Sequence, residues 1–296
     1  MNLGLLAALV DDAGLFPPEQ LPMAAALARH RADEAEGHPM LSHRFLCPAS
    51  RLAELRAEMA RLEHGDGGAP LRLGVILDTG VDGLAAAEAD VTAGGPGVSP
   101  GETASLALEM IEVPAPSAEA VSTALDALAG FEPVAFLEGP RDPGWVKTVA
   151  AWRGPGGLRG AKVRCGGARA ELFPSPEELA AFVCACAGNG VPFKATAGLH
   201  GAIRHRDEET GFVHHGFLNL VLAAVAAAMG AAVDDVATVL AATDGPALAA
   251  EARAVSARAL SAGRLLFRAY GSCSTREPRE AAAALGLLPA PGPPEA

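Results

Sequence analysis

Strand-like apolar segments alternate with helix-like segments along almost the whole chain, and this alternation limits the fold more than any other feature. Seven such segments are clear, and an eighth would lie near Leu9 or after His200. The clear segments are residues 43–48, 71–78, 104–113, 133–138, 160–167, 191–198 and 264–270. Strands separated by helices form a parallel sheet with helical cover. The sequence therefore predicts an α/β protein.

A single (β/α)8 barrel of the TIM type is the first choice for this fold, because a chain of 296 residues has the right length for one. The predicted domain covers residues 1–288, and we expect residues 289–296 to be a disordered tail. Three further helical segments, 216–229, 234–242 and 247–262, follow the strand of Lys194 and would make the barrel irregular. The alternative is an open doubly wound sheet, but no G-x-G-x-x-G fingerprint supports a dinucleotide domain.

Charge and composition exclude several classes of partner. A formal net charge of -12 argues against nucleic acid and against anionic membrane surfaces, although a local basic pocket could still bind a phosphate. The longest apolar run, 220–233, is too short to span a bilayer comfortably, and the amino terminus lacks the basic start of a signal peptide. Five scattered cysteines in such a chain indicate reduced thiols and a cytoplasmic protein. The sequence leaves open whether the chain forms a homo-oligomer.

Two of the only three lysines, Lys162 and Lys194, stand inside strand-like apolar segments. Ammonium groups are seldom placed in such surroundings without a partner. Side chains alternate across a strand, so Lys162 and Arg164 share one face, and Lys194 and Thr196 share one face of the next strand. If helices cover the apolar faces, the cations point into the barrel, where the carboxyl ends of the strands carry active sites.

Two glutamates, Glu112 and Glu138, also end predicted strands and would converge on the same end of the barrel. One reading makes them catalytic acids or bases, and another makes them ion-pair partners, as in a structural pair of Glu138 with Lys162. Two ammonium groups on adjacent strands should depress one another's pKa, which would leave one of them a neutral amine able to form a Schiff base. We expect neither a cofactor nor a metal, because no metal-ligand spacing supports one.

A resemblance adds to this hypothesis. The strings Lys162-x-Arg164-x-Gly166-Gly167 and Lys194-Ala195-Thr196-Ala197-Gly198, with a late Gly271-Ser272-Cys273-Ser274 turn, resemble class I aldolases of the deoxyribose-phosphate aldolase type. The resemblance covers the carboxyl-terminal half of the chain. It implies that Lys162 forms the Schiff base and Lys194 tunes it, although the string around Lys194 resembles the family's nucleophile segment equally well. It also implies that Gly166, Gly167, Gly271, Ser272 and Ser274 bind the substrate and its phosphate.

The chain departs from that family between Lys194 and Gly271, where it is much longer and carries four of its eight histidines. His200 lies just beyond a strand end and His215 at the expected start of a helix, so either could move protons at neutral pH. The alternative for both is a local hydrogen bond in a loop. Cys273 follows the last strand, and a packing role is favoured over a nucleophilic one because no G-x-C-x-G elbow surrounds it.

These observations predict an aldolase-like carbon-carbon lyase acting on a small anionic carbonyl compound. Glu112, Glu138 or His200 would move protons, while Arg164 and Thr196 would bind the substrate. A second hypothesis is a barrel lyase or isomerase that stabilises an enolate with lysine and arginine, with or without a divalent metal. A third is a non-catalytic barrel that binds a small molecule.

Overall fold

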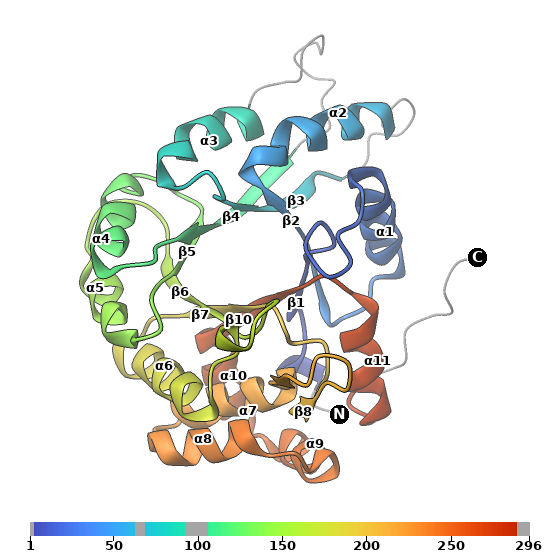
Figure 1. The fold of residues 1–296 in the computed structure, drawn as a ribbon, viewed down its shortest axis with the longest axis vertical. Coiled ribbons are helices and arrows are strands. Elements are labelled where there is room, and N and C mark those ends of the chain that lie inside the picture. The colour runs from blue at the N-terminus through green and yellow to red at the C-terminus, as the bar shows by residue number, and fades with distance from the viewer. Residues whose placement is uncertain (1–2, 63–68, 93–105, 289–296) are drawn as a thin grey trace.

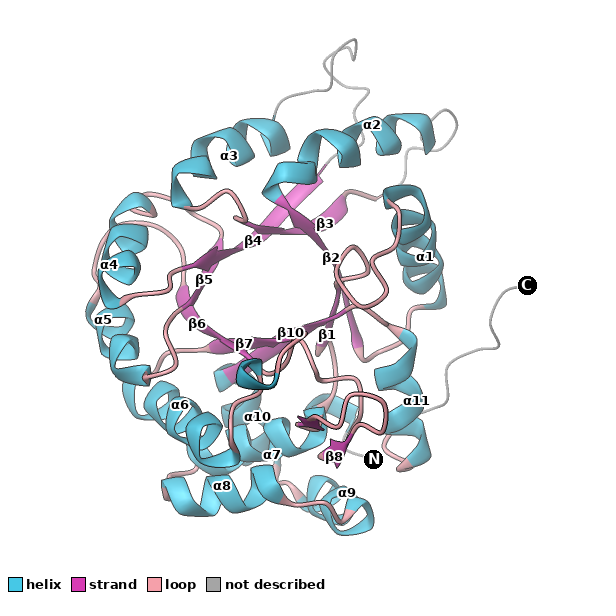
Figure 2. Cartoon of the chain, in the orientation of Figure 1, coloured by secondary structure: helices cyan, strands magenta, loops and turns pink. Residues whose placement is uncertain are grey.

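The computed structural model is a closed barrel of eight parallel strands surrounded by helices (Figures 1 and 2). It describes residues 3–62, 69–92 and 106–288. The prediction of a (β/α)8 barrel is confirmed, and the eighth strand is β1, which closes the barrel between β2 and β10. The strands are β1 (Val10–Asp12), β2 (Leu41–Pro48), β3 (Leu71–Ile76), β4 (Leu106–Pro114), β5 (Val134–Glu138), β6 (Arg159–Arg164), β7 (Phe193–Thr196) and β10 (Phe267–Ser272).

The helices lie outside the barrel, and most of them connect one strand to the next (Figure 2). The first six are α1 (Met23–Glu36), α2 (Leu52–Leu62), α3 (Leu84–Thr92), α4 (Ala118–Ala127), α5 (Val146–Ala151) and α6 (Pro176–Asn189). The last five are α7 (Phe217–Ala228), α8 (Val233–Ala241), α9 (Gly245–Ala254), α10 (Ala257–Leu266) and α11 (Arg276–Ala284). The extra helices predicted after the Lys194 strand are therefore present as α7 to α10.

The connection from β7 to β10 departs from the regular pattern. It contains a short antiparallel pair, β8 (His205–Arg206) and β9 (Val213–His214), before α7 begins. Helix α7 is buried along nearly its whole length, and it packs against α6, α8 and α10. Figure 1 shows α8 and α9 outside this layer, at the bottom of the view. The added helices thus form a second layer over one side of the barrel.

Two predicted boundaries in this region are wrong. The segment 247–262, expected as one helix, is divided between α9 and α10, because the Ser256 side chain accepts a hydrogen bond from Ala259 N and starts a new helix. Residues 264–266, expected to start the last strand, are the end of α10. The predicted tail, 289–296, lies outside the described residues.

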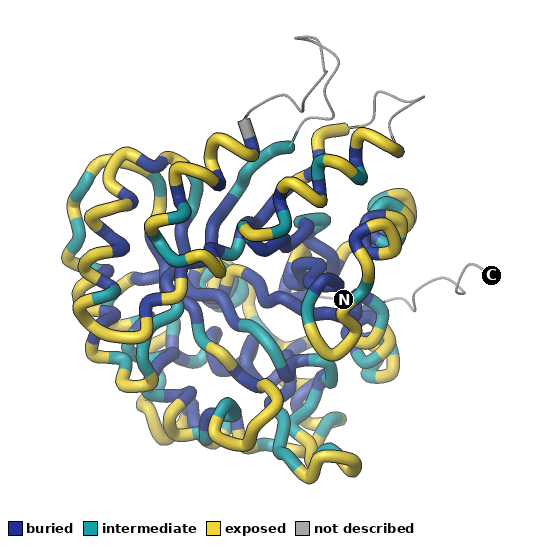
Figure 3. Tube along the Cα trace, turned by 45° about the horizontal axis from the view of Figure 1, so that its top comes forward, coloured by how far each residue is buried: buried dark blue, intermediate teal, exposed yellow. Residues whose placement is uncertain are grey.

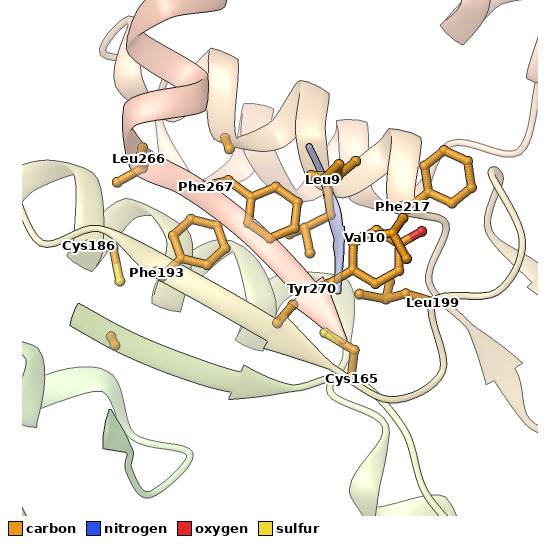
Figure 4. Close-up of a cluster of buried hydrophobic side chains, with 14 of the residues drawn as sticks. Leu9, Val10, Cys165, Cys186, Phe193, Leu199, Phe217, Leu266, Phe267 and Tyr270 are labelled. Carbon is orange, nitrogen blue, oxygen red and sulfur yellow. The ribbon is translucent and has the colours of Figure 1, made fainter. Parts of the chain in front are cut away.

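The main hydrophobic core lies between the barrel and its helices. Phe193 of β7 and Phe267 of β10 stack with ring centroids 4.9 Å apart, and Tyr270 stacks on Phe217 of α7 at 6.0 Å (Figure 4). Because Phe193 faces outward, its neighbour Lys194 must face the barrel interior. Figure 3 shows the same division in the buried barrel strands and the exposed outer sides of the helices.

A smaller apolar cluster fills part of the barrel interior. It consists of Ala13, Leu46, Met110 and Phe136. Gly74 of β3 makes room for it, since a Cβ atom there would lie 2.6 Å from Leu46 Cδ2 and 2.8 Å from Met110 Cε. The rest of the interior is charged, and this charged part forms the candidate site.

In the part of the chain that the structure describes, no helix is both long and apolar enough to cross a membrane.

Candidate active site

The two buried lysines share one carboxylate. Glu112, on β4, lies 2.5 Å from Lys162 Nζ through Oε2 and 2.9 Å from Lys194 Nζ through Oε1. Lys162 and Lys194 are direct neighbours in the register of β6 and β7, and Glu112 reaches both from β4, which β5 separates from β6. The prediction that these side chains meet inside the barrel is therefore confirmed by their contacts.

Lys162 is the lysine nearer the barrel mouth, which is the end formed by the carboxyl ends of the strands. Its second partner is Glu138, with 2.8 Å between Lys162 Nζ and Oε2. Glu138 Oε1 accepts a hydrogen bond from Arg164 Nε at 2.9 Å. Glu138 and Arg164 are the last residues of β5 and β6, and the Arg164 side chain is 43% exposed. A ligand entering the mouth would therefore meet Arg164 and Glu138 before Lys162.

Lys194 lies deeper, with a side chain that is 1% exposed, and its second partner is Asp11 of β1. Asp11 also accepts hydrogen bonds from Ser42 Oγ at 2.5 Å and from Arg44 Nη1 at 2.7 Å. The Nζ of Lys194 is 5.8 Å from the centroid of the Phe136 ring. Lys194 is thus enclosed by carboxylates and apolar atoms, with little access to solvent.

These contacts belong to a longer series, which we call the interior ion chain. Arg44 Nη2 lies 2.9 Å from Glu109 Oε2. Glu109 Oε1 in turn lies 2.5 Å from Arg72 Nε, near the amino ends of β3 and β4. Cations and carboxylates alternate along its nine side chains, which are, in order, Arg164, Glu138, Lys162, Glu112, Lys194, Asp11, Arg44, Glu109 and Arg72.

Sequence reasoning missed four members of the interior ion chain: Asp11, Arg44, Glu109 and Arg72. Asp11 ends an apolar run, as Glu112 and Glu138 do. Arg44 stood within a predicted strand, where its charge was a usable signal. Glu109 is an extra residue at a β-bulge, because Leu73 pairs with Leu108 and Gly74 with Met110. A bulge re-aims a side chain, which alternation alone cannot foresee.

The charges fix the protonation states of the central groups. Burial raises the pKa of Glu112, but Lys162 and Lys194 outweigh it and lower the pKa to about 2. Burial lowers the pKa of Lys162, but Glu112 and Glu138 reverse this and leave the pKa above its usual value. The expectation that the lysines depress one another's pKa is therefore wrong for Lys162, because Glu112 stands between the two ammonium groups.

No protein-family model, no curated protein and no solved structure matches this chain. The resemblance to deoxyribose-phosphate aldolases therefore rests on the residues themselves, and any activity taken from it is a proposal.

The residues expected to bind substrate gather at the mouth beside these groups. Thr196 is the last residue of β7 and pairs in register with both Arg164 and Gly271. A Cβ atom on Gly271 would lie 3.7 Å from Thr196 Oγ1, so Gly271 faces the interior. Gly166 and Gly167 follow β6, and Gly166 touches the backbone of Gly198 so closely that a Cβ atom would lie 2.8 Å from its Cα. This contact holds together the loops that follow β6 and β7.

The two serines expected to bind phosphate have partners within the protein. Ser272 Oγ donates to the carbonyl oxygen of Ser274 at 2.6 Å, and Ser274 Oγ accepts from Glu277 N at 3.2 Å. Both residues are buried. Their hydroxyl groups shape the turn that leads into α11, so the structure does not support a phosphate site there.

His200 lies at the mouth but contacts a different group of residues. Its Nδ1 is 2.9 Å from Glu277 Oε2, and its Nε2 is 3.7 Å from Cys273 Sγ. Burial lowers its pKa, but these two partners raise the pKa to about 10. A proton shuttle that titrates near neutrality, as expected from the sequence, is therefore not what this environment produces.

His215 has a structural role. Its Nε2 lies 2.7 Å from the carbonyl oxygen of Pro174, and its Nδ1 lies 3.2 Å from Arg204 Nη1. The residue is fully buried, and burial is the main cause that lowers its pKa to about 4. With both ring nitrogens occupied, His215 joins the loop before α6 to the loop before α7, and the prediction that it moves protons is not supported.

Within the described ranges, no group of three or more His, Cys, Asp or Glu side chains is arranged to hold a metal ion.

Proposed function

We propose that the protein is an aldolase-like lyase in which Lys162 forms a Schiff base with a small anionic carbonyl substrate. The observation that carries the proposal is the position of Lys162, between two carboxylates and on the mouth side of Lys194. Barrels of this kind are often enzymes with active sites at this end.

The amine must first lose a proton, and two acceptors are in contact with it. In the ligand-free state Lys162 is charged, because Glu112 and Glu138 raise its pKa. A substrate that fills the mouth displaces water, and a low dielectric penalises separate charges on both lysine and glutamate. We infer that Glu138 then takes the proton from Lys162, since it is the more exposed of the two carboxylates.

The neutral amine of Lys162 attacks the carbonyl carbon, and Glu138 returns its proton to the former carbonyl oxygen, which leaves as water and gives a protonated imine. Its positive charge lies where the ammonium group was, beside Glu112, so the ion pair is retained. Glu138, again a carboxylate, takes the proton of the substrate's β-hydroxyl group, the carbon-carbon bond breaks, and its electron pair passes to the imine to give an enamine and an aldehyde. Protonation of the enamine and hydrolysis release the second product and restore Lys162.

The charge balance of the site favours an anionic substrate. The interior ion chain has five cations and four carboxylates, so it carries a formal excess of one positive charge. The protein as a whole has a formal net charge of -12. Arg164 ends the interior ion chain at the mouth, where its Nε donates to Glu138 and its side chain is 43% exposed. A planar guanidinium suits a carboxylate or phosphate with two oxygens.

One observation favours a second candidate function. Because the pKa of Lys162 is raised, its ammonium group stays charged and could stabilise the negative charge of an enolate, with no covalent step. The protein would then be an enolate-forming lyase or isomerase that uses the same residues.

Borohydride reduction separates the two candidates. The protein is incubated with a panel of small hydroxy-carbonyl acids and phosphates, reduced, digested and mapped by mass spectrometry. The Schiff-base proposal expects an adduct at Lys162 that is lost in Lys162→Met. Lys147, an exposed lysine on α5, is the internal control for non-specific reduction.

Turnover of a compound in the panel without an adduct at Lys162 would favour the enolate mechanism. Adducts at Lys147 and Lys162 in equal yield would contradict both the Schiff base and a specific site. Lys194→Met should reduce the rate of adduct formation at Lys162 without abolishing it, because Lys194 acts on Lys162 only through Glu112.

A further inference from the structure

A second group of reactive side chains lies at the barrel mouth, outside the interior ion chain. Cys273 is the first residue after β10, and His200 follows β7, the neighbouring strand of the barrel. Glu277 lies on the first turn of α11. The topology therefore brings a thiol, an imidazole and a carboxylate together from three separate segments.

The three groups are arranged in the order that activates a nucleophile. Cys273 Sγ is 3.7 Å from His200 Nε2, and the opposite ring nitrogen, Nδ1, is 2.9 Å from Glu277 Oε2. A base in contact with the nucleophile, and a third group that orients the base, are the geometric signature of covalent catalysis. Cys273 is mostly buried, whereas the side chain of His200 is 24% exposed.

We propose that Cys273, His200 and Glu277 form a second reactive site, in which the Cys273 thiolate attacks small uncharged electrophiles that enter the mouth. The site requires no lysine chemistry and so goes beyond the proposed lyase function. A thiolate, an imidazolium and a carboxylate carry one net negative charge, which disfavours anionic reagents. The buried position of the sulfur requires a small one.

The chemistry is balanced without an additional oxidant or reductant. In the resting thiolate–imidazolium pair the thiol proton already lies on His200 Nε2, and the sulfur forms a bond to the electrophilic carbon. With iodoacetamide the carbon-iodine bond breaks and iodide leaves with its electron pair. With an aldehyde, the same proton passes from His200 to the carbonyl oxygen, which gives a hemithioacetal.

The electrostatics agree with this assignment. Cys273 and Glu277 raise the pKa of His200 to about 10 against the effect of burial, which keeps the imidazole charged beside the sulfur. His214 on β9 is also affected by the charge of His200, and its own pKa is lowered, chiefly by burial. Among the other cysteines, burial raises the pKa of Cys47 and Cys165 to about 12 and also raises that of Cys184.

Alkylation of the full-length protein tests the proposal. Cysteine peptides are quantified by mass spectrometry after timed exposure to iodoacetamide or iodoacetate between about pH 5 and pH 9, a range that brackets activated and ordinary thiols. At about pH 6, Cys273 should react with iodoacetamide at least about tenfold faster than Cys184, the partly exposed internal control. Iodoacetate should react more slowly than iodoacetamide.

His200→Gln should lower the rate at Cys273 by about tenfold near pH 6, and the rate should recover as the pH rises and the thiol ionises by itself. His205→Gln, which alters an exposed histidine whose Nδ1 lies 2.9 Å from the Ile203 carbonyl oxygen and whose ring stacks on His214, is the matched control and should leave the rate unchanged. An unlabelled Cys273, a rate no faster than that of Cys184, or equal rates in His200→Gln and the unaltered protein would overturn the proposal.

Discussion

Glu112 is the residue on which both buried lysines depend. It contacts Lys162 and Lys194 with different oxygens, and it is almost completely buried. Without it, two ammonium groups on neighbouring strands would face one another in a low dielectric, where repulsion is strong. The single carboxylate therefore stabilises the folded barrel and sets the charge state of the proposed nucleophile.

We predict that Glu112→Gln lowers the free energy of unfolding at pH 7 by about 3–5 kcal/mol, the usual cost of breaking a buried ion pair. The folded pKa of Glu112 is about 2, below its ordinary value of 4.5. Its stabilising effect is therefore complete above pH 4.5 and is lost as the pH falls from 4.5 toward 2. The variant should lose this part of the acid dependence.

Denaturant unfolding at a series of pH values measures both effects. Glu119→Gln, at an exposed position in the first turn of α4, is the control, and it should follow the unaltered protein at every pH. A Glu112→Gln variant within about 1 kcal/mol of the unaltered protein at pH 7 would show that Glu112 does not hold the lysines.

At the scale of single elements, alternation along the strands was the reliable signal. It correctly placed Lys162 and Lys194 inside the barrel, since their neighbours Ala161, Phe193 and Ala195 belong to the outer core. It failed at Glu109, because a bulge adds one residue to β4 and shifts the alternation. Register irregularities depend on pairing with the next strand, and no local pattern in the sequence records that.

Helix α6 shows a local signal that was sufficient. Ser175, Pro176 and Glu178 form the pattern typical of a helix start, and the structure contains the complete capping box, with Ser175 Oγ accepting from Glu178 N and Glu178 accepting from Ser175 N. The end of α10 lacked such a signal, because the apolar residues 265–267 fit a helix or a strand equally well.

We predict that Ser175→Ala lowers the free energy of unfolding by about 1 kcal/mol, because it leaves a helical N–H group without its acceptor. Ser122→Ala is the matched control within α4, where the hydroxyl group donates only to the Ala118 carbonyl and its loss should be nearly neutral. Thermal or denaturant unfolding of both variants provides the comparison. Equal stability of the two would mean that the capping box does not stabilise α6.

At the scale of the whole molecule, the interior ion chain passes through the barrel from one end to the other. Its terminal residues, Arg164 and Arg72, have side chains that are 43% and 44% exposed, whereas Asp11 in the middle is fully buried. Glu112 meets lysines on strands that are not its neighbours, and Lys194 meets Asp11 across β10. These contacts exist only when the barrel is closed, which is why the sequence could identify its lysines but not their full set of partners.

Closure also predicts which members of the interior ion chain are energetically coupled. Arg44 and Lys194 both bind Asp11. Loss of either cation leaves Asp11 one cationic partner, but loss of both leaves a buried carboxylate without a cation, which takes up a proton instead of remaining charged. The double variant Arg44→Met with Lys194→Met should therefore lower the free energy of unfolding by less than the sum of the single variants, and the difference should exceed about 0.5 kcal/mol.

The control pair, Arg72→Met with Arg164→Met at the two exposed ends, should be additive within about 0.5 kcal/mol. Denaturant unfolding of the six variants at pH 7 completes both cycles, and additivity in the first cycle would mean that Asp11 does not join the two halves of the interior ion chain.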